Sequence, residues 1–508
     1  MRLYGFTPLS CATFAVLKRD ITINAGTPER RNETINFFFT MKIYHVLLVL
    51  WTLFTLPAFG QLGMGGQPHS SAALDVKATD KAFYPPRLTT IQRKAIADPQ
   101  PGAFVYDLDQ TTFYLFDGQR WLPLATQNPT NPIPATRLAD DGNNGDQFGG
   151  TVAISGDYAL VGATSDKVGT NASQGSAYVF VRNGNTWSQQ AKLTASDGAA
   201  FDKFGWSVAI SGDYALVSAY TDDIGANVNQ GSAYVFMRDG TNWTQQAKLT
   251  AGDGAANDEF GSSVSISGDY AVVGASKDDV LATVNQGSAY VFLRNGTNWN
   301  QQGKLTAGDG AASDELGISV VISGSHVIAG VPRDDINANV NQGSAYVFVR
   351  NGNTWSQQEK VVASDGAAND EFGTSVALSG DNALVGADGL NLNQGTVYSF
   401  VRFGNDWLET VKLHVGNGSS NNRFGSSVSI SGDYAIVGAP NRNGDTYQGA
   451  VYLFRRTGST WFEVRFITDT APYTQNGHSV AISNGSFIIG GPSFDMQKGK
   501  VSFGTTDN

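Results

Sequence analysis

One seven-residue segment recurs almost unchanged through the middle of the chain. The heptapeptide Gln-Gly-Ser-Ala-Tyr-Val-Phe begins at Gln174, Gln230, Gln286 and Gln342, so each copy follows the previous one by 56 residues. A period of this length indicates a repeating supersecondary unit, because helix and strand periods are far shorter. We therefore expect an array of similar modules, and we look for function in the array before any single residue.

The modules are delimited by a recurring Phe-Gly pair. The first four steps between pairs are 56 residues long and the last two are 52. Spacing this regular favours a closed array of equal modules. The seven pairs, two of them degenerate, are Phe148-Gly149, Phe204-Gly205, Phe260-Gly261, Leu316-Gly317, Phe372-Gly373, Phe424-Gly425 and Asn476-Gly477.

Each module carries the pattern of four short strands. In the second copy, Ser207–Ser211 alternates polar and apolar residues, and a Ser-Gly-Asp turn leads into Tyr214–Val217. A polar loop precedes the aromatic segment Ser232–Met237, and the turn Asp239-Gly240 leads into Trp243–Leu249. Four short antiparallel strands in about 50 residues are typical of one β-propeller blade.

The two ends of the array complement each other. The seventh copy has strand patterns at 479–482, 486–490 and 500–503 but lacks the fourth, tryptophan-bearing strand. Residues 136–142 precede the first Phe-Gly pair and resemble residues 192–198, which end another copy's fourth strand. We therefore predict an all-β fold: a seven-bladed β-propeller of four-stranded antiparallel blades over residues 135–508, closed by an N-terminal strand that completes the last blade.

These motifs resemble the FG-GAP repeat, the blade unit of the integrin α-subunit propeller. Phe424-Gly425 and Val437-Gly438-Ala439-Pro440 carry both halves of that name, and the Ser-Gly-Asp turn is similar to the short bacterial variety. The resemblance implies a propeller used for binding and leaves the ligand open.

The front of the chain predicts export. Residues 41–60 combine Met41-Lys42 with a short apolar core and small residues before Gln61, as a signal peptide does. We take residues 1–40 as a mis-assigned upstream extension; a cytoplasmic tail on a signal anchor is the alternative. The single cysteine, Cys11, precedes the expected cleavage site, so we expect no disulfide in the mature chain. We therefore expect a secreted or cell-surface bacterial protein with no membrane span in the mature chain.

A small module separates the signal peptide from the propeller. Residues 61–127 resemble a module found at the front of many bacterial surface proteins, and residues 128–134 form a linker rich in Pro and Asn. The segment 113–121 has the pattern of a β-hairpin. A core this small is marginal alone, so we expect the module to pack on the propeller or to self-associate.

The net charge of −11 restricts the partners. An acidic surface disfavours nucleic acid and anionic membranes, and it permits divalent cations. Integrin FG-GAP repeats bind calcium in the hairpin between the first two strands. Here that hairpin holds one carboxylate, which is a poor calcium site. We expect turn formers at Asp157, Asp213, Asp269, Asp381 and Asp433, and no cofactor other than possible calcium.

Carboxylates accumulate instead in two other sets of loops, those between blades and those between the second and third strands. In an up-and-down blade both sets emerge at the same face, so we predict an acidic face that binds divalent cations or a basic partner. The alternative is that these residues form turns and keep the ring soluble. The candidate ligand-binding residues are Asp197, Asp202, Asp222, Asp223, Asp253, Asp258, Asp278, Asp279, Asp309, Asp314, Asp334, Asp335, Asp365 and Asp370.

Aromatic residues offer a second kind of site. The fourth-strand tryptophans could stack on sugars, but we expect blade packing, because burying an indole removes a large apolar surface from water. They are Trp187, Trp243, Trp299, Trp355, Trp407 and Trp461.

Signals of catalysis are sparse. His326, His414 and His478 occupy separate copies without a shared motif, and the paired carboxylates repeat with the blades. We therefore expect no enzyme, but a non-catalytic binding or adhesion protein that contacts an extracellular protein or glycan through its acidic face. Two alternatives stay open: a lectin-like propeller that binds carbohydrate, and a propeller hydrolase or lyase with acids at the central channel.

Overall fold

The computed structural model describes residues 85–109, 112–116, 120–124, 135–389, 394–415, 422–441, 448–469 and 471–506. The chain divides into two units, Met1–Asn128 and Pro129–Asn508. The predicted upstream extension (1–40), signal peptide (41–60) and linker (128–134) lie outside the described residues and stay predictions. Among the described helices, none has the length and apolar character needed to cross a membrane.

The first unit contains one four-stranded sheet in the order β1-β2-β3-β4. Strands β3 and β4 pair antiparallel, which confirms the hairpin predicted in this segment. A short helix, α3, begins with a capping box on Thr89. The elements are β1 (Arg87–Leu88), α3 (Thr90–Lys94), β2 (Phe104–Asp107), β3 (Thr112–Phe116) and β4 (Trp121–Leu124).

A buried ion pair joins α3 to the sheet of this unit. Arg93 Nε lies 2.8 Å from Asp107 Oδ2, and both side chains are almost fully buried. The Thr90 hydroxyl also donates to Asp107, and the Arg93 guanidinium lies 3.6 Å from the centre of the Tyr114 ring. Because each buried charge has several partners, the pair fixes the helix in one position.

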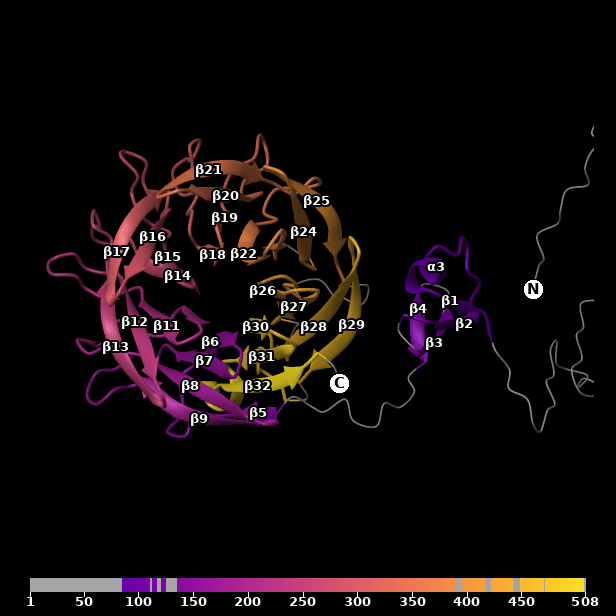
Figure 1. Ribbon diagram of the computed structural model, residues 1–508, viewed down its shortest axis with the longest axis horizontal. Coiled ribbons are helices and arrows are strands. Elements are labelled where there is room, and N and C mark those ends of the chain that lie inside the picture. Colours follow the sequence, from indigo (N-terminus) through magenta and orange to yellow (C-terminus); the bar gives the residue numbers. More distant parts are fainter. Residues whose placement is uncertain are drawn as a thin grey trace, which may run out of the picture. The chain divides into compact units, whose positions relative to one another are not determined.

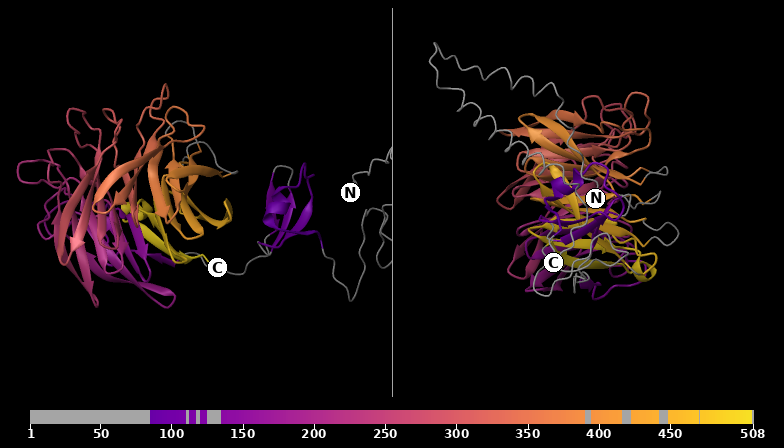
Figure 2. Two further views of the ribbon diagram at one scale, coloured as in Figure 1. Left: turned by 45° about the horizontal axis from the view of Figure 1, so that its top comes forward. Right: turned by 90° about the vertical axis from the view of Figure 1, so that its right-hand side faces the viewer.

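The second unit contains seven four-stranded antiparallel sheets. Figure 1 shows them side by side around a ring, with the first strand of each sheet innermost and the fourth outermost. Figure 2 shows the same arrangement obliquely and edge-on. The predicted all-β architecture of repeated four-stranded blades is therefore confirmed.

Sheets 1 to 7 are named in ring order, and their strands are as follows. Sheet 1 contains β6 (Phe148–Ser155), β7 (Tyr158–Ala163), β8 (Ser176–Asn183) and β9 (Thr186–Leu193). Sheet 2 contains β10 (Val208–Ser211), β11 (Tyr214–Ala219), β12 (Ser232–Asp239) and β13 (Asn242–Leu249). Sheet 3 contains β14 (Phe260–Ser267), β15 (Tyr270–Ala275), β16 (Ser288–Asn295) and β17 (Asn298–Leu305). Sheet 4 contains β18 (Ser319–Ser323), β19 (His326–Val331), β20 (Ser344–Asn351) and β21 (Thr354–Val361). Sheet 5 contains β22 (Phe372–Ser379), β23 (Asn382–Ala387), β24 (Thr396–Phe403) and β25 (Asp406–Leu413). Sheet 6 contains β26 (Ser427–Ser431), β27 (Tyr434–Ala439), β28 (Ala450–Thr457) and β29 (Thr460–Thr468). Sheet 7 contains β30 (Ser479–Ser483), β31 (Ser486–Gly491), β32 (Lys500–Thr505) and β5 (Ala135–Arg137), with the short helical segment α4 (Phe494–Gln497) before β32.

Sheet 7 is assembled from both ends of the second unit. Strand β5 pairs antiparallel with β32, with Thr136 opposite Ser502. The sequence predicts this pairing from the missing fourth strand of the last copy. As a result, the first strand of the unit lies in its last sheet.

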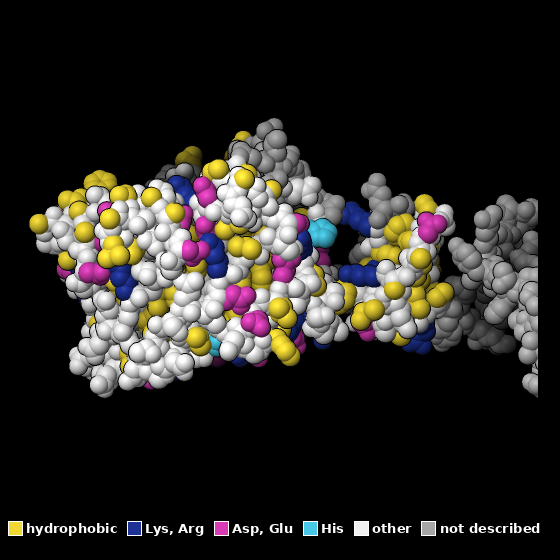
Figure 3. Space-filling model, turned by 90° about the horizontal axis from the view of Figure 1, so that it is seen from above, with side chains coloured by type: hydrophobic (Ala, Val, Ile, Leu, Met, Phe, Trp, Pro, Cys, Tyr) yellow, Lys and Arg dark blue, Asp and Glu magenta, His cyan; other side chains and the backbone are white. Residues whose placement is uncertain are grey.

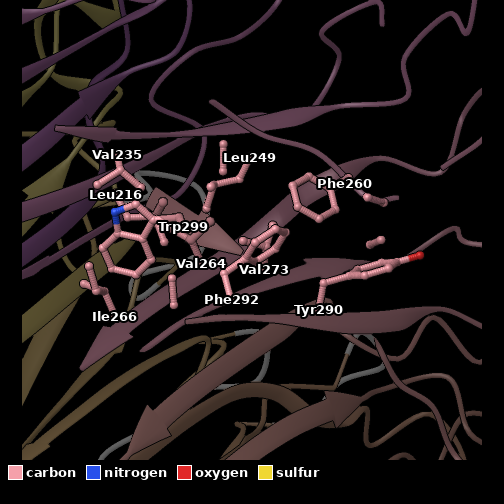
Figure 4. Packing of buried hydrophobic residues seen from close by; sticks show 14 residues of the cluster. Leu216, Val235, Leu249, Phe260, Val264, Ile266, Val273, Tyr290, Phe292 and Trp299 are labelled. Atoms are coloured by element: carbon pink, nitrogen blue, oxygen red, sulfur yellow. The ribbon is translucent and has the colours of Figure 1, made fainter. Parts of the chain in front are cut away.

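The hydrophobic core lies between neighbouring sheets. Between sheets 2 and 3, Leu216 and Val235 pack against Phe260, Phe292 and Trp299 (Figure 4). The six fourth-strand tryptophans are buried or half-buried, and Trp299 meets the ring of Tyr214 edge-on at 5.9 Å. Their expected role in blade packing is confirmed.

Glycines permit the sheets to touch along the inner edge of the ring. A Cβ on Gly330, in the inner part of sheet 4, would lie 1.9 Å from the carbonyl oxygen of Gly373 in sheet 5. Gly373 itself has a φ of +103°, and its own Cβ would lie 2.3 Å from the Ser344 carbonyl. The two glycine motifs of the repeat therefore meet at the seam between sheets, where backbone packs directly on backbone.

We predict that Gly330→Ala destabilises the second unit by about 3 kcal/mol, because the methyl group would force two backbones apart. Chemical denaturation monitored by tryptophan fluorescence measures the effect. Gly303→Ala is the matched control: its Cβ would meet only Trp355, at 3.9 Å, and Ala191 and Ala247 occupy the equivalent position in other copies. Equal stability of the two variants would contradict this account of the seam.

Candidate functional site

A lysine on the fourth strand neutralises most of the predicted acidic loops. In sheet 2, Lys248 Nζ lies 2.7 Å from both Asp197 Oδ2 and Asp222 Oδ2. The Tyr234 hydroxyl lies 3.0 Å from the same two carboxylates. The lysine equivalents are Lys192 with Asp141 and Asp166, Lys304 with Asp253 and Asp278, Lys360 with Asp309 and Asp334, and Lys412 with Asp365.

These contacts keep the network charged. Partial burial opposes ionisation of Asp197, but hydrogen bonds from Lys248 and Tyr234 outweigh it and lower the pKa of this carboxyl. Burial likewise opposes the charge of Lys248, and hydrogen bonds to Asp197 and Asp222 raise the pKa of the lysine. In the face that Figure 3 presents, acidic and basic side chains are accordingly interspersed.

A second group of the predicted carboxylates lies in the turns between sheets, with Asp202, Asp258 and Asp314 buried and Asp370 half-buried. Asp258 Oδ2 accepts a hydrogen bond from Ala255 N at 2.6 Å, and Asp202, Asp314 and Asp370 make the same contact in their own turns. Burial, reinforced by the charge of Asp278, raises the pKa of Asp258 to about 6. These side chains therefore close turns.

A third group lies at the tips of the loops between the second and third strands. Asp223, Asp279 and Asp335 are exposed, and each accepts a hydrogen bond at 2.8 Å from the backbone N–H of an asparagine six residues later. Each of the fourteen carboxylates thus has a partner inside its own structure. Within the described ranges, no group of three or more His, Cys, Asp or Glu could hold a metal ion. The ligand-binding role of these residues stays a prediction.

The aspartates of the first hairpin pair with arginines. Arg182 lies 2.5 Å from Asp157, and Arg456 lies 2.8 Å from Asp433. Asp213, Asp269 and Asp381 form the equivalent ion pairs with arginines of their own sheets. These contacts support the expected role as turn formers.

A cavity of about 500 Å³ lies where the innermost strands of all seven sheets begin. Hydroxyl groups line its wall, and in six of the seven sheets the one at the second position after the Phe-Gly pair donates to the glycine carbonyl of the next Phe-Gly segment; in sheet 2, Ser207 Oγ instead accepts from Val264 N. The pairs are Thr151 with Gly205, Ser263 with Gly317, Ser319 with Gly373, Ser375 with Gly425, Ser427 with Gly477 and Ser479 with Gly149, at 2.6–3.0 Å. The last of these joins sheet 7 to sheet 1.

The position directly after each Phe-Gly pair lines this cavity and differs between copies. Its residues are Gly150, Trp206, Ser262, Ile318, Thr374, Ser426 and His478. The flanking positions barely change. Sequence reasoning missed this site, although an alignment of the copies with one another would have shown variation concentrated at one position in a nearly constant frame.

Trp206 is the largest side chain in the cavity wall. It is 40% exposed, and its ring centre lies 4.2 Å from that of Tyr220. Its Nε1 donates to the Ser262 carbonyl at 3.2 Å, across the seam between sheets 2 and 3. The indole is therefore fixed in place while it remains accessible.

The cavity wall is uncharged. Its described lining residues include no Asp, Glu, Lys or Arg, and His478 is the one titratable group among them. Although the His478 side chain is open to the cavity, the surrounding protein removes bulk water and lowers its pKa. The arrangement can hold a neutral ligand through hydroxyl, amide and aromatic contacts, and it offers no carboxylate pair for hydrolysis.

We predict that Asp258→Asn raises the thermal unfolding midpoint at pH 7 and leaves it unchanged at pH 4. The pKa of Asp258 is about 6 in the folded protein, against an ordinary value of 3.8. As the pH rises from 3.8 through 6, the unfolded chain gives up this proton more readily than the folded protein does, so the free energy of unfolding falls. Asparagine keeps the acceptor for Ala255 N–H and cannot ionise.

Asp253→Asn provides the contrast. Hydrogen bonds from Lys304 and Tyr290 overcome partial burial and lower the pKa of Asp253, so its stabilisation is present above pH 3.8 and disappears in acid. Its replacement should lower the midpoint at pH 7. Shifts of the same sign in both variants would refute the assignment.

Parts of the sequence match two known protein families. Six segments match the FG-GAP repeat: residues 135–180, 187–236, 243–292, 299–348, 355–400 and 407–454. Residues 63–137 match the phage tail like trimerisation region. No curated protein gives a significant match. Because the repeat matches cover more than half of the chain, and each spans strands of the sheets described above, this protein belongs to the FG-GAP repeat family.

Proposed function

We propose that the chain is a secreted or cell-surface, non-catalytic binding protein that holds its ligand in the cavity where the innermost strands begin. One observation carries this proposal: the copies share a nearly constant frame but differ where their side chains meet in the cavity wall. Packing requires the frame to be constant, and variation at one lining position suits a single asymmetric ligand. Recessed sites of this size, at roughly 300–1,000 Å³, are typical of ligand binding.

We also propose that the seven sheets form a closed seven-bladed propeller. Three contacts between the chain ends support closure: the pairing of β5 with β32, the bridge between Phe148 and Gly499, and the hydrogen bond from Ser479 to the Gly149 carbonyl. Closure covers the outer edge of β32 with β5 and joins sheet 7 to sheet 1, so the cavity wall is held on all sides.

A disulfide across β5 and β32 tests closure. The Thr136 and Ser502 hydroxyl oxygens lie 3.3 Å apart, so Thr136→Cys with Ser502→Cys should oxidise spontaneously and raise the thermal midpoint under non-reducing conditions only. The single substitutions are the controls. A double variant that keeps two free thiols after oxidation would contradict a closed ring.

The N-terminal unit is proposed to join three chains. The match of residues 63–137 to a phage tail like trimerisation region supports this, as do large hydrophobic side chains that the small unit leaves exposed: Ile91 at 59%, Phe104 at 36% and Leu108 at 40%. Three linked propellers would bind a surface with higher avidity than one, because the second and third contacts form at high local concentration.

We predict that the full-length chain sediments as a trimer, and that Ile91→Glu combined with Leu108→Glu gives monomers by placing charges in the apolar contact. Analytical ultracentrifugation measures this. Ala97→Glu, at an exposed position of the same unit, should remain trimeric.

Binding of these three forms to arrays of extracellular proteins and glycans tests the function. The trimer should bind at least one ligand with about 100-fold higher apparent affinity than the monomer. A trimer that binds no better than the monomer, or not at all, would contradict the proposed display of three binding sites.

A further inference from the structure

One part of the cavity wall, which we call the sector, runs from sheet 7 through sheet 1 to sheet 2 and includes His478, Gly150 and Trp206. Gly150, in sheet 1, stands between His478 of sheet 7 and Trp206 of sheet 2 in ring order. A Cβ on Gly150 would come no closer than 3.3 Å to another atom, that of the Gln147 carbonyl, so no neighbouring sheet demands glycine here. The missing side chain opens space between an imidazole and an indole.

The indole in this sector is not required for packing. The equivalent positions of the other six copies hold no aromatic ring apart from the His478 imidazole, and their seams still form. Contact with the Tyr220 ring, whose plane is tilted by 36°, and the hydrogen bond to Ser262 hold the Trp206 ring in one orientation while 40% of the residue stays exposed. A fixed, accessible indole is a platform for the flat apolar face of a ligand.

Polar groups in the same sector match hydroxyl groups. His478 Nδ1 lies 3.1 Å from the Gly150 carbonyl, which can only accept, so the neutral ring presents Nε2 as an acceptor. Gln147 Oε1 accepts from Thr164 and Ser165, and Gln475 Oε1 accepts from Ser493. These contacts orient both amides. The N–H groups of the two amides make no hydrogen bond to a described residue, so they can donate to a ligand.

The residue directly before each Phe-Gly pair differs in charge between the copies. Where sheets 1 and 7 carry Gln147 and Gln475, the other five copies carry charged residues: Lys203, Glu259, Glu315, Glu371 and Arg423. In a chain with a net charge of −11, sheets 1 and 7, which contribute Gly150 and His478, therefore place two neutral amides in the cavity lining. Among its described residues, the cavity wall in this sector holds no carboxylate, lysine or arginine; the Lys203 ammonium lies outside the lining, 3.4 Å from the Ser165 hydroxyl that donates to Gln147.

We propose that this sector is a binding site for a neutral saccharide. A pyranose ring stacks its C–H face on Trp206, and its hydroxyl groups donate to His478 Nε2 and accept from the amides of Gln147 and Gln475. The inference rests on the proposed function, since it names the ligand class of the same cavity. It differs from a lectin built on the fourth-strand tryptophans, because those side chains pack between the sheets.

The test titrates the full-length chain with neutral trisaccharides, namely cellotriose, maltotriose and N,N′,N″-triacetylchitotriose, and with the charged trimers of galacturonate and glucosamine. Saturation-transfer NMR and tryptophan fluorescence report binding. We expect at least one neutral trisaccharide to bind, neither charged trimer to bind more tightly, and Trp206→Ser to weaken binding by about tenfold or more. Serine occupies the equivalent position in two other copies, so this variant should fold.

Two further variants complete the design. Phe201→Ala removes an aromatic side chain that is 63% exposed in the same copy and outside the cavity wall, and it should bind like the unmodified chain. Gln147→Glu places a charge beside the opening and should weaken the binding of neutral ligands.

Unchanged affinity in Trp206→Ser would overturn the inference while leaving a binding protein. Tighter binding of a charged trimer that Trp206→Ser abolishes would overturn the ligand class but keep the cavity as the site. Absence of binding by every saccharide would overturn the inference alone, since the protein array tests the broader function independently.

Discussion

The structure depends on direct contact between the backbones of adjacent sheets. At six of the seven seams a glycine of one sheet faces the carbonyl of a Phe-Gly glycine in the next, as Gly330 and Gly373 show, and only between sheets 2 and 3 does a serine, Ser218, take this position. The aromatic residue of the same pair fills the space behind the contact: Phe204, Phe260 and Phe372 are fully buried. The seams bring the innermost strands close together, so the residue that follows each Phe-Gly pair projects into the cavity wall.

The positions of the charged side chains also repeat from sheet to sheet. In sheets 1 to 4 the lysine of the fourth strand lies between the carboxylates of two loops, and in five sheets the arginine of the third strand pairs with the aspartate of the first hairpin. Ionic groups are thereby paired toward the outside and the ends of the sheets. The cavity wall is left with hydroxyl, amide and apolar groups, which suits a ligand recognised by shape and hydrogen bonds.

The fold could be predicted from local signals that repeat. Alternation, Gly-based turns and the missing seventh tryptophan strand were sufficient to predict four-stranded sheets and the pairing of β5 with β32. The partners of the acidic residues were harder to predict, because Lys248 follows Asp197 by 51 residues and belongs to the next copy. A loop examined alone shows its charges and not the distant lysine that neutralises them. The cavity was missed for a related reason, since Trp206 and His478 lie almost five repeats apart and meet only around the ring.

The placement of β5 in the last sheet has a consequence for the order of folding. Thr136 and Ser502 are separated by 366 residues, so this pairing closes a very long loop. Sheets 1 to 6 are each contiguous in sequence, so each can form from contacts that are local in the chain. A folding chain can therefore complete sheets 1 to 6 while β32 still lacks β5, and the entropic cost of pairing these two strands is smaller once the intervening sheets have packed.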